Sequence, residues 1–334
     1  METLNNSGFR RKKARIYGLF SEKTTLNQCL PMDILPEEGL TVALGSFDGV
    51  HLGHAALISR AVADARANHR ASAVWTFSDD PAVLPGKSGM RSITSLDEKL
   101  DLIAALGVDY AILAGFADVR SLSPEEFVKD MLMRGCGAKT VVCGFNYTFG
   151  KNGAGKPDTL KSIMGDNCII VDPVCVDGEP VSSSAVRALL EAGDAEEAAK
   201  LLGHYFFINF PVVHGKELGR TIGLPTINQN FPSGLIIPKE GIYASIVGID
   251  GREYVGVSNV GKRPTVDDSG RVNCETHIIG FEGWLYGEHI KVGLAKWLRG
   301  EKKFPDIDSL RAQIESDAKA AEEYFKALKN GKKQ

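Results

Sequence analysis

Residues 45–54 form a glycine- and histidine-containing turn between a predicted strand and a predicted helix. They read Gly-Ser-Phe-Asp-Gly-Val-His-Leu-Gly-His and follow the apolar run 41–44. The next segment, 55–68, lacks Gly and Pro and carries apolar residues at helical spacing. A helix N-terminus has unpaired N–H groups and partial positive charge, so this junction suits a phosphate group. His51 and His54 can hydrogen-bond the same anion, and the turn therefore predicts a nucleotide-handling site.

The first half of the chain alternates short apolar runs with helical segments. The runs lie at 42–44, 73–77, 110–113 and 139–144, the predicted helices at 55–68, 96–106 and 123–134, and a helical pair at 184–202. This alternation is typical of a parallel sheet with crossover helices, so we expect a doubly wound α/β domain. Ligands of such sheets bind beyond the carboxyl ends of the strands, where the 45–54 turn falls.

The second half is rich in short β-type runs. They lie at 205–213, 241–249, 254–260, 274–281 and 290–295. Asp250-Gly251 indicates a hairpin, and an apolar stripe from Leu310 to Leu328 behind a cap at 308–309 predicts a C-terminal helix. We expect a small β-barrel or sandwich with a C-terminal helix. The predicted organisation is a basic tail at 1–14, a first domain at 15–202 and a second at 203–334.

Composition excludes several classes of protein. The 334 residues carry a net charge of -3, which gives no sign of a nucleic-acid surface. No apolar stretch is long enough to span a membrane, and the N-terminus lacks the apolar core of a signal peptide. The six cysteines form no CxxC pair. We expect a cytoplasmic protein with reduced thiols that acts on small molecules, without nucleic-acid or membrane partners, as a monomer or weak homo-oligomer.

Two further segments of the first half combine with the turn. Residues 181–187 read Val-Ser-Ser-Ser-Ala-Val-Arg and open a helix, where the hydroxyls can cap the helix or bind phosphate and Arg187 can reach a triphosphate. Residues 144–150 read Gly-Phe-Asn-Tyr-Thr-Phe-Gly. Taken alone, the serines are a plain helix cap, and the aromatic loop is as well explained by core packing. The string 150–156 is nearly a P-loop, but Pro157 follows where a hydroxyl is required, so it is rejected as a nucleotide motif.

Together these strings resemble bacterial bifunctional riboflavin kinase/FMN adenylyltransferases, the FAD synthetase family. The 45–54 turn resembles the HxGH signature of nucleotidyltransferases, and 181–187 resembles Ser-Ser-Thr-x-Ile-Arg. Departures occur at Asp80, where His is common, at Tyr147, where Phe is usual, and at Ser184-Ala185-Val186. The resemblance implies catalytic roles for His51, His54 and Arg187, and nucleotide binding by Gly45, Phe47, Gly49, Gly53, Asn146, Ser183 and Ser184; it gives Asp80 no role.

The second half has a cationic, glycine-containing loop at 214–228. Its glycines, with Lys216 and Arg220, suit ATP phosphates. Thr226 and Asn228 place two oxygen-bearing side chains on one side of an extended segment, and neutral oxygens with phosphate and water suit Mg²⁺. A β-turn with a polar edge explains either piece alone.

The joined string resembles the riboflavin kinase signature Gly-Arg-x-x-Gly-x-Pro-Thr-Ala-Asn, with Ile227 at the Ala position and Leu218 where Arg is frequent. Glu275, in Asn-Cys-Glu-Thr-His-Ile, is otherwise an ordinary solvent-facing strand residue, but the family's Val-Glu-x-His segment makes it the expected general base. The resemblance also implies ATP binding by Gly215, Lys216, Gly219, Arg220 and Gly223, Mg²⁺ binding by Thr226 and Asn228, and a flavin or lid contact by Arg299.

The implied activity is bifunctional. ATP and riboflavin would give FMN in the C-terminal domain, and FMN and ATP would give FAD and pyrophosphate in the N-terminal domain, both with Mg²⁺. Two alternatives remain open at this point. One is a riboflavin kinase whose adenylyltransferase domain is inert because of its departures from the family pattern. The other is a flavin sensor without catalysis.

Overall fold

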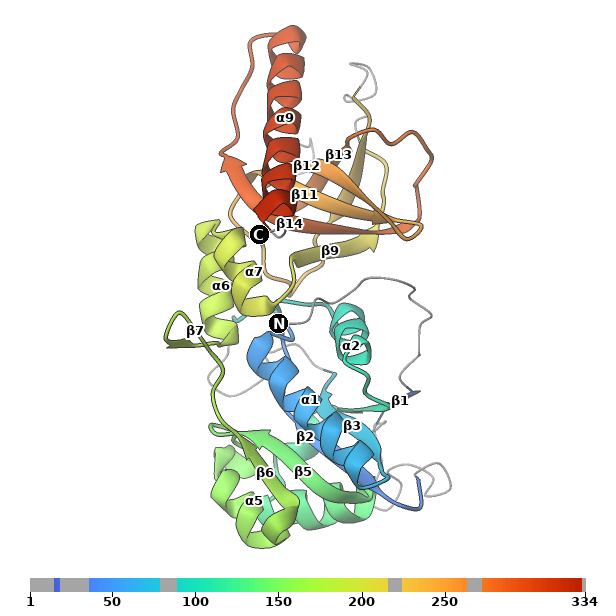
Figure 1. The fold of residues 1–334 in the computed structure, drawn as a ribbon, viewed down its shortest axis with the longest axis vertical. Coiled ribbons are helices and arrows are strands. Elements are labelled where there is room, and N and C mark those ends of the chain that lie inside the picture. Colours follow the sequence, from blue (N-terminus) through green and yellow to red (C-terminus); the bar gives the residue numbers. More distant parts are fainter. Residues whose placement is uncertain (1–14, 19–35, 79–88, 216–223, 263–271, 332–334) are drawn as a thin grey trace. The chain divides into compact units, whose positions relative to one another are not determined.

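The computed structural model describes residues 36–78, 89–215, 224–262 and 272–331, and the backbone of 15–18. The chain divides into two compact units, one that ends at Ser183 and one that begins at Ser184. Each unit contains its own six-stranded sheet (Figure 1). The expected fold class, a doubly wound α/β unit followed by a β-rich unit with a C-terminal helix, is confirmed.

The sheet of the first unit is entirely parallel. Its order is β1-β4-β3-β2-β5-β6. The strands are β1 (Arg15–Gly18), β2 (Leu40–Leu44), β3 (Ala71–Phe77), β4 (Tyr110–Ala114), β5 (Ala138–Gly144) and β6 (Cys168–Val171). From β2 the chain runs outward to β3 and β4, and then returns to β5 on the other side of β2. The strand order therefore reverses beside β2, and the loops after β2 and β5 flank the switch point where doubly wound sheets bind ligands.

Helices connect these strands. They are α1 (Leu52–Ala67), α2 (Leu96–Ala105), α3 (Phe116–Val119), α4 (Pro124–Glu126), the π-helix η4 (Phe127–Gly135), η5 (Lys151–Gly153), α5 (Pro157–Met164) and η6 (Gly165–Asn167), and a small hairpin of β7 (Cys175–Val176) and β8 (Glu179–Pro180) follows. The helices expected at 55–68 and 96–106 are confirmed. The helix expected at 123–134 is present, but most of it has π-helical hydrogen bonding.

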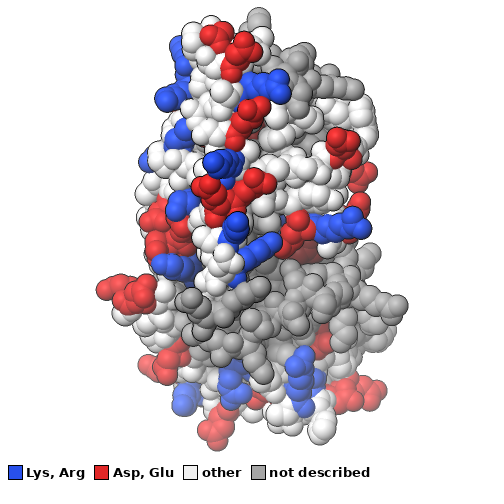
Figure 2. All heavy atoms as spheres, turned by 45° about the horizontal axis from the view of Figure 1, so that its top comes forward, with Lys and Arg blue, Asp and Glu red and all other residues white. Residues whose placement is uncertain are grey.

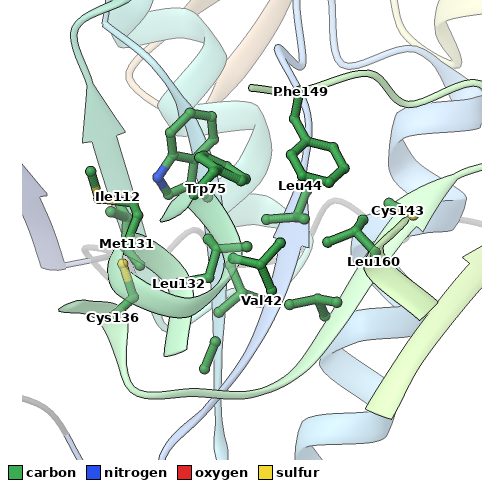
Figure 3. Close-up of a cluster of buried hydrophobic side chains, with 14 of the residues drawn as sticks. Val42, Leu44, Trp75, Ile112, Met131, Leu132, Cys136, Cys143, Phe149 and Leu160 are labelled. Carbon is green, nitrogen blue, oxygen red and sulfur yellow. The ribbon is translucent and has the colours of Figure 1, made fainter. Parts of the chain in front are cut away.

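Two buried clusters cover the two faces of the parallel sheet. Alternate residues of β2 point to opposite faces, so Val42 and Leu44 join one cluster and Ala43 joins the other. In the first cluster the fully buried Trp75 meets the ring of Phe127 edge to face at 5.0 Å. Figure 3 shows Trp75 among side chains of the sheet and of the π-helix. The apolar residues of the π-helix thus close this face.

The second unit begins with two helices and continues as an antiparallel sheet of order β10-β13-β12-β11-β14-β9. The helices are α6, which starts at Ser183 and runs to Ala192, and α7 (Ala195–Leu202). The strands are β9 (Phe206–Pro211), β10 (Thr226–Asn230), β11 (Gly241–Ile249), β12 (Arg252–Lys262), β13 (Val272–Ile278) and β14 (His289–Arg299), and α9 (Ile307–Gly331) ends the unit. The helical pair expected at 184–202 and the Asp250-Gly251 hairpin are both present.

Backbone and side-chain bonds bring the two ends of this sheet together. The Val213 N–H donates to the Asn228 carbonyl at 2.8 Å. The fully buried Gln229 donates its side-chain amide to the carbonyls of Phe210 and Ile290, at 2.7 Å each. One side chain of β10 therefore holds both β9 and β14, and the sheet curls into the expected barrel.

The C-terminal helix α9 packs Ala321 and Phe325 on β11, β12 and β14. Its first turn is capped from outside the helix, because the Asp306 carboxylate accepts from the Ser309 N–H at 2.7 Å; the cap expected at 308–309 lies inside the helix instead. On the face in Figure 2, acidic and basic side chains are interspersed. Within the described ranges, no helix is both long and apolar enough to cross a bilayer.

Candidate functional sites

The 45–54 turn has an unusual backbone that fixes the position of its side chains. Phe47 and Val50 adopt positive φ angles of 51° and 39°, and Gly49 lies between them at 80°. Phe47 is fully buried, and a Cβ at Gly45 would lie 2.8 Å from its ring. Positive φ is costly for residues other than glycine, so surrounding contacts must hold this turn. The turn lies at the carboxyl end of β2, as the sequence predicted.

His51 and His54 lie together at the start of α1. Their rings stack at 3.6 Å with an interplanar angle of 15°. His51 is the N-cap of α1, and its Nδ1 accepts the His54 N–H at 3.3 Å. The neutral His51 ring therefore carries its proton on Nε2 and presents a donor there. Burial lowers the pKa of His51 from 6.5 to about 4, so this imidazole is neutral near pH 7.

A buried carboxylate, Asp48, ties the turn to two other segments. Its Oδ1 accepts the N–H groups of Ile93 at 2.9 Å and Thr94 at 3.4 Å. The Thr94 hydroxyl in turn accepts the Gly49 N–H at 3.2 Å. The Asp48 carbonyl accepts the hydroxyl of Ser183, the first residue of α6, at 3.0 Å. The N–H of Gly49 is therefore hydrogen-bonded within the protein, and Gly49 serves the turn through its positive φ angle.

Gly53 lies in the first turn of α1, and Ser184 and Arg187 lie in α6. A Cβ on Gly53 would lie 3.2 Å from the ring of His51, so Gly53 leaves room for the imidazole. Ser184 and the buried Arg187 follow Ser183 in the first turns of α6. Asp80 lies outside the described residues.

The aromatic loop after β5 divides its side chains between the core and the solvent. Phe149 is buried and Tyr147 packs beside it, with ring centroids 5.7 Å apart. Asn146 is exposed, and Phe145 is 48% exposed. Because β5 is the parallel neighbour of β2, this loop and the 45–54 turn lie at the same edge of the sheet. Core packing accounts for Tyr147 and Phe149, and Phe145 and Asn146 remain accessible to a ligand.

The second candidate site is a polar face on β10 and β13 of the barrel. Thr226 donates its hydroxyl to Glu275 Oε1 at 2.6 Å. Asn228 stands opposite Glu275 in the strand pairing, and its Oδ1 accepts the side-chain amide of Asn273 at 3.0 Å. Three residues that the sequence analysis selected, Thr226, Asn228 and Glu275, are therefore brought together from positions about 50 residues apart. Asn273 was missed because only the strand pairing relates it to Asn228.

The segment that leads into the cationic loop lies directly on this face. A Cβ on Gly215 would lie 2.4 Å from the side-chain amide nitrogen of Asn228, so only glycine permits this approach. The other predicted loop residues, Lys216, Gly219, Arg220 and Gly223, lie outside the described residues. The His214 ring stacks on Tyr286 at 4.0 Å beside the same segment.

The oxygen atoms on this face fit a hard cation. Thr226 and Asn228 offer neutral oxygens, and a carboxylate lies within hydrogen-bond distance of Thr226. Mg²⁺ prefers oxygen ligands and retains several waters or phosphate oxygens, so a dedicated cage of side chains is not required. Among the described residues, no group of three or more His, Cys, Asp or Glu side chains forms such a cage.

Arg299 makes its contacts within the protein. Its Nε and Nη2 atoms donate to the buried Asp317 of α9, the latter at 2.6 Å, and Nη1 donates to the Gly300 carbonyl. Gln313 donates to the same carboxylate at 3.0 Å. This forked ion pair fastens the end of β14 to α9. The expected flavin contact of Arg299 stays a prediction.

Comparison with known proteins matches two family models, one in each half of the chain. Residues 34–185 match the family model described as FAD synthetase, and residues 202–325 match riboflavin kinase. A solved structure of a Streptococcus pneumoniae protein described as a macrolide-efflux protein is 31% identical, with a TM-score of 0.76, and the match covers 87% of this chain and 96% of that one.

Curated relatives cover nearly the whole chain. The bifunctional riboflavin kinase/FMN adenylyltransferase of Bacillus subtilis (strain 168) is 36% identical over 316 residues, which are 91% of this chain and 99% of that protein. The protein of the same description from Escherichia coli (strain K12) is 37% identical over 298 residues, 87% of this chain and 94% of that protein. With both modules matched in order and the polar face of the barrel intact, the chain belongs to the bifunctional riboflavin kinase/FMN adenylyltransferase family.

Proposed function

We propose that the chain converts riboflavin to FAD in two ATP-dependent steps, the first in the barrel and the second in the α/β domain. The observation that carries the proposal is the bond between Thr226 and Glu275, which holds a carboxylate on a face of neutral oxygens beside the predicted phosphate loop. A kinase that acts on an alcohol needs such a carboxylate near the acceptor hydroxyl. In this proposal the adenylyltransferase domain spans residues 15–202 and the riboflavin kinase domain spans residues 203–334.

In the kinase step, Glu275 accepts the proton of the terminal hydroxyl of riboflavin. The hydroxyl oxygen then attacks the γ-phosphorus of ATP, the new P–O bond forms FMN, and ADP leaves. Thr226 donates to Glu275 Oε1 and so orients the carboxylate, leaving Oε2 for the substrate. Mg²⁺, held by Thr226 and Asn228, would neutralise phosphate charge. Gly215, Lys216, Gly219, Arg220 and Gly223 would surround the ATP phosphates.

In the adenylyl step, a phosphate oxygen of FMN attacks the α-phosphorus of ATP, and pyrophosphate leaves as FAD forms. This reaction needs alignment and stabilisation of negative charge more than covalent participation. A neutral His51 with its proton on Nε2 can donate to a phosphate oxygen, beside the stacked ring of His54 and the N-terminus of α1. We assign Arg187, Ser183, Ser184 and Asn146 to the same nucleotide.

The proposal includes the cellular setting that the sequence predicts. We expect the protein to be a cytoplasmic enzyme that works as a monomer or weak homo-oligomer, on small-molecule substrates alone.

One time course tests both steps. The protein is incubated with riboflavin, ATP and Mg²⁺, and FMN and FAD are separated; we expect FMN first and FAD after it. A parallel reaction with FMN and ATP measures pyrophosphate release. FMN without FAD would leave a kinase with an inert adenylyltransferase domain, and flavin binding without either product would indicate a sensor. FAD formation at the parental rate in His54→Ala would remove the role given to the turn.

A further inference from the structure

The polar face of the barrel extends beyond Glu275 to a third strand. Asn228 of β10, Glu275 of β13 and Asn259 of β12 are direct partners in successive antiparallel pairings. Side chains at paired positions lie on the same face, about 5 Å apart. Asn259 therefore stands next to the proposed base, on the side opposite Asn228. None of the steps proposed above uses it.

Asn259 holds a second carboxylate at this face. Its side-chain amide nitrogen donates to Glu301 Oε1 at 3.1 Å. Because a carboxylate can only accept, the amide must present its NH₂ group in this contact. Glu301 is exposed, and Asn259 lies between it and the neighbouring position occupied by Glu275. The neutral amide thus separates two acidic groups that would repel each other if they stood side by side.

One glycine of β12, Gly261, leaves room for the Glu301 carboxylate. A Cβ added to Gly261 would lie 2.3 Å from Glu301 Oε1 and 3.0 Å from its carboxyl carbon. The segment that carries Glu301 is also fastened just before it, where Arg299 is paired with Asp317. Contacts on both sides thus hold an accessible carboxylate over the strand. A solvated surface glutamate needs neither a glycine beneath it nor an amide partner.

We propose that Glu301 is a specificity-determining residue of the kinase step, which accepts hydrogen bonds from the polyol chain of the alcohol substrate. This inference rests on the proposed function. Riboflavin carries several hydroxyls beside the one that is phosphorylated, and a carboxylate offers only acceptors to them. With Glu275 at the reacting hydroxyl, Glu301 meets hydroxyls further along the chain. In this proposal the ring system of the flavin makes no hydrogen bond to Glu301.

The test compares a flavin that has the polyol with one that lacks it. In Glu301→Gln, we expect the KM for riboflavin to rise about tenfold, as for the loss of a hydrogen bond to a charged acceptor. The inhibition constant of lumiflavin, which has a methyl group in place of the polyol, stays at the parental value. Gly261→Ala displaces the carboxylate without removing its charge, and we expect the same selective effect on riboflavin. Glu282→Gln, an exposed glutamate of the same unit, is the matched control and leaves both constants unchanged.

Each outcome decides the question. An unchanged KM for riboflavin in Glu301→Gln, or an equal loss for riboflavin and lumiflavin, overturns the inference. Urea unfolding of the same protein reports whether the barrel is folded, and Gly261→Ala supplies the answer if Glu301→Gln is poorly folded. If the unsubstituted protein makes no FMN, the proposed function itself fails, which is a different result from a kinase that is indifferent to Glu301.

Discussion

The hydroxyl of Thr226 donates to Glu275 Oε1 at 2.6 Å, across the neighbouring strands β10 and β13. A hydrogen bond from a hydroxyl to a carboxylate at this distance is a strong, charge-assisted one. It directs one oxygen of Glu275 toward the residue predicted to bind metal and leaves the other for a substrate. Thr226 thus has a second role, because it orients the proposed base as well as offering an oxygen ligand.

Glu275→Gln is expected to lower the kcat of riboflavin phosphorylation by a factor of about 10² to 10⁴, the usual contribution of a general base. The amide is nearly isosteric and can still accept from Thr226, so the barrel should fold. The rate of FMN formation is measured with ATP in excess.

Two controls accompany this variant. FAD formation from supplied FMN should be unchanged, because the other unit carries that step, and Glu322→Gln on α9 should behave as the unsubstituted protein. A Glu275→Gln protein that makes FMN at the parental rate would show that another group takes the proton.

His51 should make the first unit sensitive to acid. Its pKa is lowered to about 4 by burial, and an unfolded histidine titrates near 6.5. The unfolded chain therefore binds more protons than the folded one between these values, and stability is lost as pH falls from about 6.5 toward 4. The loss attributable to His51 approaches about 1.4 kcal/mol for each pH unit inside that window.

Urea unfolding at several pH values measures this effect. His51→Asn keeps a side-chain oxygen at the N-cap but cannot titrate, so its free energy of unfolding should fall less between pH 6.5 and 4.5. His69→Asn is the control, because His69 is exposed and has a positive φ of 55°, which asparagine tolerates. Equal pH dependence in all three proteins would mean that His51 is not held neutral by the fold.

Local patterns predicted most of the fold, because helix and strand periods are local properties of the sequence. The run predicted at 73–77 and the helix predicted at 55–68 were found in this way and correspond to β3 and α1. The strand at 168–171 was missed because Cys-Ile-Ile-Val is too short to show a period, and α5 was missed because it has only eight residues and begins at Pro157, directly after the string that resembles a P-loop. The π-helical part of 123–134 also left no signal in the sequence, because the apolar spacing of so short a segment does not distinguish π-helical from α-helical hydrogen bonding.

The sites were predicted less completely, because their partners are distant in sequence. Motifs selected His51, Thr226 and Glu275, but nothing near residue 48 indicates that its carboxylate binds a segment 45 residues later. Likewise, Asn259 and Glu301 are 42 residues apart. Such contacts follow from strand register and loop path, which a motif does not contain.

Asp48 is expected to act as a positioning residue for the adenylyl step. In Asp48→Ala, the N–H groups of Ile93 and Thr94 lose their acceptor, and the positive-φ turn loses a restraint. We expect the free energy of unfolding to fall by about 1.5 to 3 kcal/mol. The kcat for FAD formation should fall as well, while FMN formation is retained.

The conservative variant separates position from charge. Asp48→Asn keeps the Oδ1 acceptor and should recover most of the adenylyltransferase activity. If Asp48→Asn is as inactive as Asp48→Ala, the negative charge itself is required, and the positioning role is wrong.

The last prediction concerns the ion pair of Arg299 and Asp317. Variants of the two residues distinguish a structural ion pair from a flavin contact by Arg299. Arg299→Met leaves the buried Asp317 carboxylate uncompensated and should lower the free energy of unfolding by about 3 kcal/mol; Asp317→Asn leaves the partly exposed Arg299 and should lower it by less. In a double-mutant cycle the two effects should overlap strongly. If the pair is purely structural, both variants change the KM for riboflavin alike, as measured by initial rates of FMN formation below the unfolding temperature. A rise in KM confined to Arg299→Met would instead place the guanidinium against the flavin, as the sequence motif implied.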